Sequence, residues 1–190
     1  MSDKNTNNLI QLIKARQSVR RFKAESVDRD LIVQCVEAAR LAPSAENAQP
    51  WRFIVIDDQE QKSRLAQKAF SGIYRPTRWA EKAPVLVILC AELDLLANRL
   101  GKQITGIQYY LIDCGIAGEH FILQAQELGL GTCWIGWFSQ KGVKKALNIP
   151  SAWRIVSLIA AGYNAGNEGK RKIRYNTEKI CYFNIVKNGK

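Results

Sequence analysis

The first group of side chains with clear chemical potential is a pair of arginines near the start of the chain. Arg16 and Arg20 are four residues apart, with Ser18 between them. On a helical or turning backbone both guanidinium groups and the hydroxyl can converge on one phosphate, whose oxygens match the planar arginine fork. A solvated basic helix end that complements the helix dipole would show the same pattern. The segment alone therefore leaves both interpretations open.

The second group is a loop from Ala42 to Phe53, which contains two prolines, a serine and two carboxamides. Asn47 and Gln49 each offer a donor and an acceptor, the mixed pattern that the pyrimidine edge of a flavin presents. Ser44 and the flanking prolines would restrain such a loop. An ordinary turn whose amides cap neighbouring backbone groups is the alternative.

The third group is the glycine-rich stretch from Gly129 to Trp137. Glycine lets the backbone approach a flat ligand closely, and a backbone N–H there could tune the reactivity of a flavin. The alternative is a helix end followed by a core strand, with Trp134 as packing. A nucleophilic Cys133 is disfavoured because no base lies next to it in the sequence.

The fourth group is a basic run from Lys170 to Arg174, close to the C-terminus. It could close on the same phosphate from the far end of the chain. As an isolated run it is more typical of a solubilising tail.

The elements that must position these groups follow from hydrophobic periodicity and caps. Helices and strands are mixed without strict βαβ alternation, which favours an α+β sheet covered by helices, in a single domain over residues 1–190. A Rossmann loop is disfavoured, because the glycine turn follows a helix and precedes a strand. We expect helices at Leu9–Arg16, from Ser26 or Asp28 to Ala39, at Gln59–Phe70, at Gln108–Leu128 and, capped by Ser139, at Lys141–Leu147. We expect strands at Phe53–Ile56, Val85–Cys90, Thr132–Ile135, Arg154–Ala160 and Ile180–Val186.

Composition excludes several classes of protein. The net charge of +11 attracts anions, but the basic residues are spread along the chain rather than interleaved with aromatics, so a nucleic-acid partner is not expected. The apolar runs are too short to span a membrane and the N-terminus is polar, which predicts a cytoplasmic protein. Five scattered cysteines and a single histidine predict reduced thiols and no metal site.

Taken in order, the four groups resemble the FMN-dependent nitroreductase superfamily. The motifs that carry the resemblance are Arg16-x-Ser18-x-Arg20-x-Phe22, Ala42-Pro43-Ser44-Ala45-Glu46-Asn47-Ala48-Gln49-Pro50-Trp51, Gly129-Leu130-Gly131-Thr132-Cys133-Trp134-Ile135-Gly136 and Lys172-Ile173-Arg174. The resemblance implies a mostly antiparallel sheet flanked by helices. It also implies an intertwined homodimer with two FMN sites along its interface, and a C-terminal segment, about residues 170–190, that reaches over the partner.

The resemblance also implies roles for individual residues. The chemistry would take place on the flavin, with no catalytic side chain. The FMN-binding residues would be Arg16, Gln17, Ser18, Arg20, Lys172 and Arg174 at the phosphate and ribityl chain, Pro43, Ser44, Asn47 and Gln49 at the ring, and Cys133, Trp134, Ile135 and Gly136 along the isoalloxazine.

The activity implied is electron transfer from NAD(P)H through flavin N5 to a nitroaromatic or quinone. Reductive dehalogenation or flavin fragmentation on the same fold is one alternative, and a non-catalytic basic protein that binds flavin or a polyanion is another. Segments Phe70–Lys82 and Leu93–Tyr110 would form the substrate wall and lid, with the aromatic residues Tyr74, Trp79, Tyr109 and Tyr110. The sequence leaves the choice between NADH and NADPH open.

Overall fold

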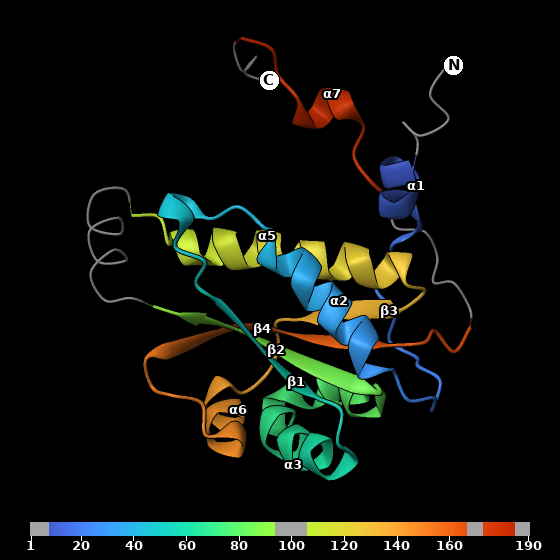
Figure 1. Cartoon of the computed structure of the whole chain (residues 1–190), viewed down its shortest axis with the longest axis vertical. Coiled ribbons are helices and arrows are strands. Elements are labelled where there is room, and N and C mark those ends of the chain that lie inside the picture. The colour runs from blue at the N-terminus through green and yellow to red at the C-terminus, as the bar shows by residue number, and fades with distance from the viewer. Residues whose placement is uncertain (1–7, 94–105, 167–172, 185–190) are drawn as a thin grey trace.

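A computed structural model describes residues 8–93, 106–166 and 173–184 of the chain. Its centre is a four-stranded antiparallel sheet with strand order β1-β2-β4-β3, covered by helices on both faces (Figure 1). This arrangement confirms the predicted α+β class. The strands are β1 (Trp51–Ile56), β2 (Val85–Glu92), β3 (Gly131–Ile135) and β4 (Trp153–Gly162).

Strand β2 is buried on both faces, as its uninterrupted apolar run predicts. Successive side chains of a strand point to opposite faces of the sheet. Val85, Val87 and Leu89 accordingly join one hydrophobic core, whereas Leu86 and Ile88 join a second. The sheet is therefore the middle of three layers, with a separate core on each side.

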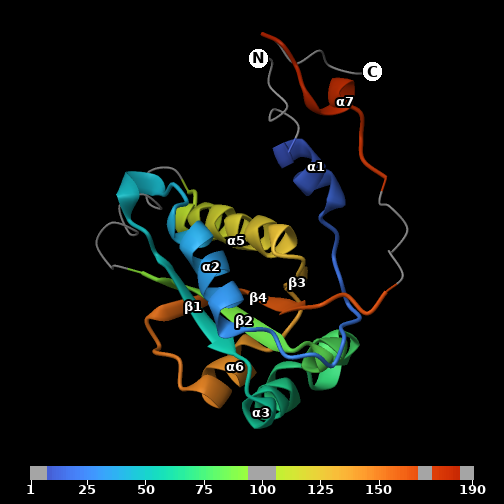
Figure 2. The ribbon, with the colours of Figure 1, turned by 45° about the vertical axis from the view of Figure 1, so that its right-hand side comes forward.

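The two outer layers are helical, and each is formed by a different set of helices (Figure 2). One consists of α2 and α5, and the other of α3, α6 and a 3-10 segment named η2, which packs beside α3. The short helix α1 lies against α5. The helical elements are α1 (Asn8–Ala15), α2 (Arg29–Arg40), η1 (Ala45–Asn47), α3 (Gln59–Ala69), η2 (Gly72–Lys82), α5 (Tyr109–Glu127), α6 (Gln140–Leu147) and α7 (Thr177–Ile180).

Capping side chains set the helix starts. Asp28, one of the two predicted caps for α2, accepts a hydrogen bond from the Asp30 backbone N–H at 2.9 Å. Ser139 caps α6 as predicted, with its Oγ 3.0 Å from the Gly142 backbone nitrogen. The expected starts of the two helices α2 and α6 are therefore confirmed to within one or two residues.

The predicted strand Ile180–Val186 is wrong over its described part. Ile180 ends the short helix α7, and residues 181–184 form no strand; residues 185 and 186 lie outside the described residues. Alternating apolar residues form a strand only when a neighbouring strand supplies hydrogen-bond partners. Here the segment stands apart from the sheet (Figure 1), and Phe183 is 85% exposed.

Within the described residues, no helix combines the length and the hydropathy needed to cross a bilayer. The cytoplasmic location stays a prediction. So does the assignment of all 190 residues to one domain.

The two capping candidates of α2 provide a matched pair for a stability test. Replacing Asp28 with Ala removes the hydrogen bond to Asp30 and should lower the free energy of unfolding by about 1 kcal/mol. Ser26→Ala should leave it within about 0.5 kcal/mol, because Ser26 caps nothing. Urea unfolding followed by circular dichroism measures both, and equal effects would contradict the assignment of the cap.

Candidate functional site

The segment that follows α1 is attached to the end of the sheet. Ser18 forms a parallel bridge with Thr132 of β3, and the Val19 backbone N–H donates to the Thr132 carbonyl oxygen at 2.8 Å. Further along, the Lys23 backbone N–H donates to the carbonyl oxygen of Tyr163 at 2.9 Å, just beyond β4. The segment from Arg16 to Lys23 therefore crosses from β3 to the end of β4, and it is called the strap.

The backbone between Arg16 and Arg20 differs from the one that the sequence interpretation assumed. The sequence interpretation relied on a helical or turning backbone, but α1 ends at Ala15 and the chain pairs like a strand at Ser18. In extended backbone, residues i, i+2 and i+4 share one side. Ser18 and Arg20 therefore lie on the side opposite the buried Val19, whereas the Arg16 backbone N–H donates to the Leu12 carbonyl oxygen at 2.9 Å and so belongs to the end of α1. No carboxylate within the described residues pairs with either arginine.

A glycine in β3 allows the strap to lie this close. A Cβ atom on Gly131 would stand 2.6 Å from Cγ2 of Val19, well inside normal contact. Gly131 is thus required for the close approach of the strap. The predicted close approach of this stretch to a flat ligand stays a prediction.

The free edge of β3 continues past the strap. Cys133 and Ile135 are buried, and the indole of Trp134 packs where Gly118 of α5 has no side chain. Because Thr132 directs its carbonyl oxygen outward to Val19, Trp134, two residues along, presents its backbone groups on the same edge. Gly136 follows in an exposed position with no heavy atom within 4 Å of an added Cβ. The outer edge of β3 from Trp134 to Gly136 is therefore open, and this edge is called the lane.

Segment η2 borders this lane through two aromatic contacts. The Arg20 guanidinium lies 5.8 Å from the ring centroid of Trp79, and Tyr74 lies 5.3 Å from the ring of Trp137. The Trp137 indole N–H also donates to the Ile73 carbonyl oxygen at 2.9 Å. The sequence indicated Tyr74 and Trp79 as wall residues and placed Trp137 at the end of the glycine-rich stretch, but it did not predict the contact of Trp137 with η2.

The amide-bearing loop has a fixed and strained conformation. Gln49 donates from its backbone N–H to Ser44 Oγ at 3.0 Å and from its side chain to Asn47 Oδ1 at 3.1 Å. Glu46, Asn47 and Gln49 all have positive φ angles, between 45° and 55°. Such backbone is rare for residues with a side chain and is typical of functional sites.

Two further side chains hold this loop in place. The buried carboxylate of Asp113, on α5, accepts a hydrogen bond from the Ala45 backbone N–H at 3.0 Å. Arg52 donates to the Gln49 carbonyl oxygen at 3.2 Å. Sequence reasoning missed both, although an acidic residue inside the apolar pattern of a long helix is a usable signal.

The loop and the strap lie at opposite ends of α5 (Figure 1). Asp113, which holds the loop, is near the start of the helix, and β3 with its strap begins just after the helix ends at Glu127. Between these two residues the helix rises about 21 Å. Within one chain the structure thus brings Arg16–Arg20 beside Cys133–Gly136, and it keeps Pro43–Gln49 apart from both.

The basic run near the C-terminus is only partly described. Lys172 lies outside the described residues. Arg174 donates to the carbonyl oxygen of Ile173, whose side chain is 97% exposed, on the arm that carries α7. A shared position of Lys172 and Arg174 with Arg16 stays a prediction.

The buried thiols are unsuited to nucleophilic chemistry. Burial raises the pKa of Cys35 and of Cys114 to about 12 and that of Cys90 to about 11, so these groups stay protonated near neutral pH. Among the described residues, no group of His, Cys, Asp and Glu side chains is placed to hold a metal ion.

Comparison with known proteins agrees with this geometry. The sequence model of the nitroreductase family matches residues 13–163, which include the strap, the loop and β3. The chain belongs to the nitroreductase family.

Individual relatives cover most of the chain. An FMN reductase [NAD(P)H] from Bacillus subtilis is 31% identical over 177 residues, which are 87% of this chain and 69% of that protein. An NADH dehydrogenase from Thermus thermophilus is 32% identical, covering 87% of this chain and 90% of the relative. The crystal structure of a nitroreductase family protein from Clostridium novyi superimposes with a TM-score of 0.73 at 32% identity, over 83% of this chain and 86% of that one.

Some relatives of lower identity have other names. A 5,6-dimethylbenzimidazole synthase from Rhodospirillum rubrum is 27% identical, and an iodotyrosine deiodinase from Thermotoga neapolitana is 26% identical. They cover 80% and 89% of this chain, and the chain covers 80% and 98% of them.

Two glycines, Gly131 of β3 and Gly136 of the lane, test the close approach of the strap. Gly131→Ala should destabilise the protein by about 1–3 kcal/mol, because its methyl group overlaps Val19. Gly136→Ala should change stability by less than about 0.5 kcal/mol, since the added atom meets open space. Thermal unfolding of the apoprotein compares them, and a harmless Gly131→Ala would show that the strap is not held against β3.

Proposed function

We propose that this protein is an FMN-dependent NAD(P)H oxidoreductase that delivers two electrons to an electron-poor acceptor such as a nitroaromatic or a quinone. The observation that carries the proposal is the pairing of the Arg16–Arg20 segment with β3, which places these polar residues beside the open edge of that strand. Membership of the nitroreductase family and the FMN reductase relative support the choice of cofactor and co-substrate.

The residues of the strap and the lane fit FMN at both of its ends. Two guanidinium groups that pair with no carboxylate of the described residues, together with a hydroxyl, suit a phosphate monoester, to which arginine binds through parallel N–H donors. Beyond them, the exposed Gly136 leaves space for a flat ring at the β3 edge. The outward backbone of Trp134 supplies hydrogen-bonding groups there without adding charge.

When bound, FMN would supply the redox chemistry, accepting a hydride from NAD(P)H and returning two electrons to the acceptor. The protein's own residues would bind and orient. Arg16, Gln17, Ser18 and Arg20 would hold the phosphate and ribityl chain, and η2 would border the acceptor with the rings of Tyr74 and Trp137. Residues 94–105 of the expected lid lie outside the described residues.

The separation along α5 bears on where the Pro43–Gln49 loop acts. The loop precedes β1, at the opposite edge of the sheet from β3, and it is held near the start of α5, whereas β3 and the strap follow the end of that helix. A ring lying along Cys133–Gly136 would then meet the loop of a second chain. Each FMN site would be composite, with the phosphate held by one subunit and Asn47 supplied by the other.

The surface of the chain supports a homodimer. Monomeric proteins rarely expose large contiguous apolar patches. On the side of α1, α2 and α5, many apolar side chains are exposed, and the C-terminal arm carries more. They are Leu9, Ile10, Ile13, Val33, Leu41, Ile107, Leu111 and Ile112 on the body, and Ile173, Tyr175, Ile180, Tyr182 and Phe183 on the arm. An arm that reaches over the partner would bury both sets.

A second candidate keeps the fold and the cofactor but changes the acceptor. The deiodinase and the 5,6-dimethylbenzimidazole synthase among the relatives favour reductive dehalogenation or flavin fragmentation as that chemistry. The aromatic border of η2 would suit an iodinated or chlorinated phenol as well as a nitroaromatic.

Product analysis separates these candidates. The FMN-loaded protein is given NADH or NADPH with a nitroaromatic, a quinone or a halogenated phenol, under air and under nitrogen. Coenzyme oxidation that depends on the nitroaromatic or quinone supports the proposal, and halide release supports the second candidate. A protein that oxidises neither coenzyme but binds polyanions with steep salt dependence would be a basic binding protein instead.

Removing the first arginine tests the phosphate end. Arg16→Ala should weaken FMN binding by about 1.5–3 kcal/mol, the range for a hydrogen bond to a charged group. Arg64→Ala, which removes a surface arginine of α3 that pairs with Glu60, is the matched control and should have little effect. Quenching of flavin fluorescence gives both dissociation constants, and an unchanged value for Arg16→Ala would reject this role.

Mixed dimers test the composite site. Arg16→Ala and Asn47→Ala each impair both sites of their own homodimer. In a mixed dimer with composite sites, one site carries both defects and the other carries neither. Heterodimers isolated with two affinity tags should therefore bind one FMN with wild-type affinity. If each site were built from one chain, every site would carry one defect and no wild-type binding would return.

A further inference from the structure

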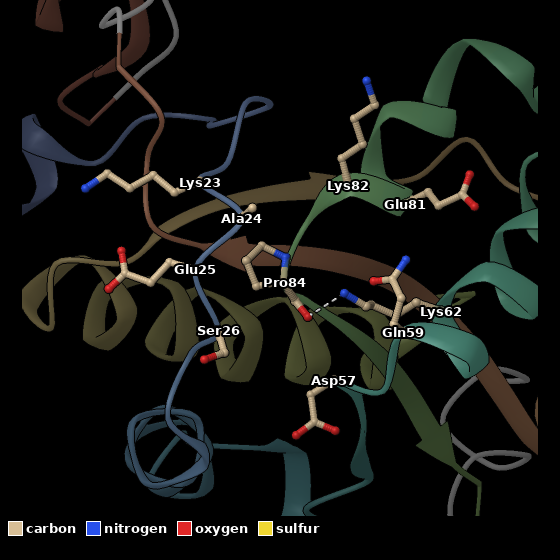
Figure 3. A pocket seen from close by; sticks show the side chains of 10 residues that line it. All are labelled: Lys23, Ala24, Glu25, Ser26, Asp57, Gln59, Lys62, Glu81, Lys82 and Pro84. Atoms are coloured by element: carbon tan, nitrogen blue, oxygen red, sulfur yellow. Dashed lines mark hydrogen bonds between the residues drawn. The ribbon is translucent and has the colours of Figure 1, made fainter.

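A second cavity lies at the end of the sheet, apart from the lane beside β3. It has a volume of about 540 Å³ and lies between the strap, the end of β1, the start of α3 and the start of β2 (Figure 3). This volume is within the usual range for small-molecule sites. Its lining residues are Lys23, Ala24, Glu25, Ser26, Asp57, Gln59, Lys62, Glu81, Lys82 and Pro84.

The unusual group in this cavity is a buried lysine. Lys62 is only 5% exposed, and its Nζ donates to the carbonyl oxygens of Ala83 and Pro84, each at 2.9 Å. In Figure 3 its side chain points to the centre of the cavity, toward Pro84. An ammonium group has three N–H donors, so one remains for another partner. Both acceptors are neutral, and buried charges normally have a charged partner.

Within the described residues, no carboxylate forms an ion pair with Lys62. Asp57 is held by Arg29 through two hydrogen bonds of 2.5 and 3.0 Å. Glu81 accepts from Arg78 at 3.1 Å and from the Ser63 hydroxyl, also at 3.1 Å. Burial lowers the pKa of Lys62, and the charges of Asp57 and Asp58 offset only part of that effect.

The other polar groups of the lining are available to a ligand. Within the described residues, neither the Ser26 hydroxyl nor the Gln59 carboxamide has a hydrogen-bond partner. Lys23 and Lys82 extend outward from the rim in Figure 3, as does Glu25. Their long, flexible stems allow the two lysines to fold over an anion at the mouth. With Asp57 and Glu81 already paired, the remaining charges are three lysines against one glutamate.

We propose that this cavity is a second anion site, which takes the phosphate group of a small phosphate monoester against Lys62, Ser26 and Gln59. The phosphate would accept the third Lys62 N–H and supply the charged partner that the lysine lacks. The remaining volume, lined in part by Ala24 and Pro84, would hold the organic part of the ligand. The proposal is independent of the flavin site.

Anion titration of the FMN-loaded protein tests the proposal, since FMN would fill the phosphate end of the lane. Sulfate, inorganic phosphate and glycerol 3-phosphate are titrated by calorimetry at constant ionic strength, with chloride as the reference anion. We expect saturable binding with a stoichiometry of one per chain. Lys62→Met should weaken it about 10-fold or more, and Ser26→Ala and Gln59→Ala about 3- to 10-fold each.

Lys145→Ala is the control, because it removes the same charge from an exposed position on α6. It should change the dissociation constant less than 2-fold. If Lys62→Met does not fold, Ser26→Ala and Gln59→Ala decide the question, since both residues lack internal hydrogen-bond partners.

Absence of saturable binding would overturn the proposal, and so would equal weakening by Lys145→Ala. An apoprotein that carries both Arg16→Ala and Arg20→Ala and still binds sulfate would separate this site from the lane even if the chain binds no flavin. Loss of all sulfate binding in that variant would assign the anion to the lane instead and overturn the second site.

Discussion

Helix α5 sets the constraint on which the rest of this structure depends. It carries Asp113 near one end, where the strained loop is fixed, and it ends beside β3, where the strap pairs with Thr132. The helix rises about 21 Å between Asp113 and Glu127, so the loop and the β3 edge lie at its two ends. In the proposed function two chains would each supply one of these groups to a composite site. The exposed apolar side chains of α1, α2 and α5 would be buried between them.

Helical layers support the sheet on both faces. Strand β2 contributes alternate side chains to the two cores, and this packing holds in place the sheet against which the strap lies. Arg16 and Arg20 lie beside the β3 edge and pair with no carboxylate of the described residues. The Lys62 ammonium is buried next to the carbonyl oxygens of Ala83 and Pro84. These are the places where we propose that the chain binds anions.

Sequence predicted the fold well where local physics decides the outcome. The apolar run of β2, the caps Asp28 and Ser139 and the long α5 pattern needed only burial periodicity and backbone hydrogen bonds. It failed at Ile180–Val186, because alternation gives no strand without a pairing partner. For the site, it selected Arg16, Ser18 and Arg20 on a helical or turning backbone, whereas the chain is helical only up to Arg16 and pairs like a strand at Ser18. The contacts of Asp113, Trp137 and Lys62 were not expected, since they join segments distant in sequence.

The central claim is that this chain uses FMN to carry electrons from NAD(P)H. The most direct measurement is the visible spectrum of the purified protein after saturation with FMN and removal of the excess, followed by NADH and NADPH addition without oxygen. The account predicts one bound FMN per chain and bleaching of the flavin band by one equivalent of at least one coenzyme. A protein that retains no FMN, or whose bound flavin stays oxidised with both coenzymes, would contradict it.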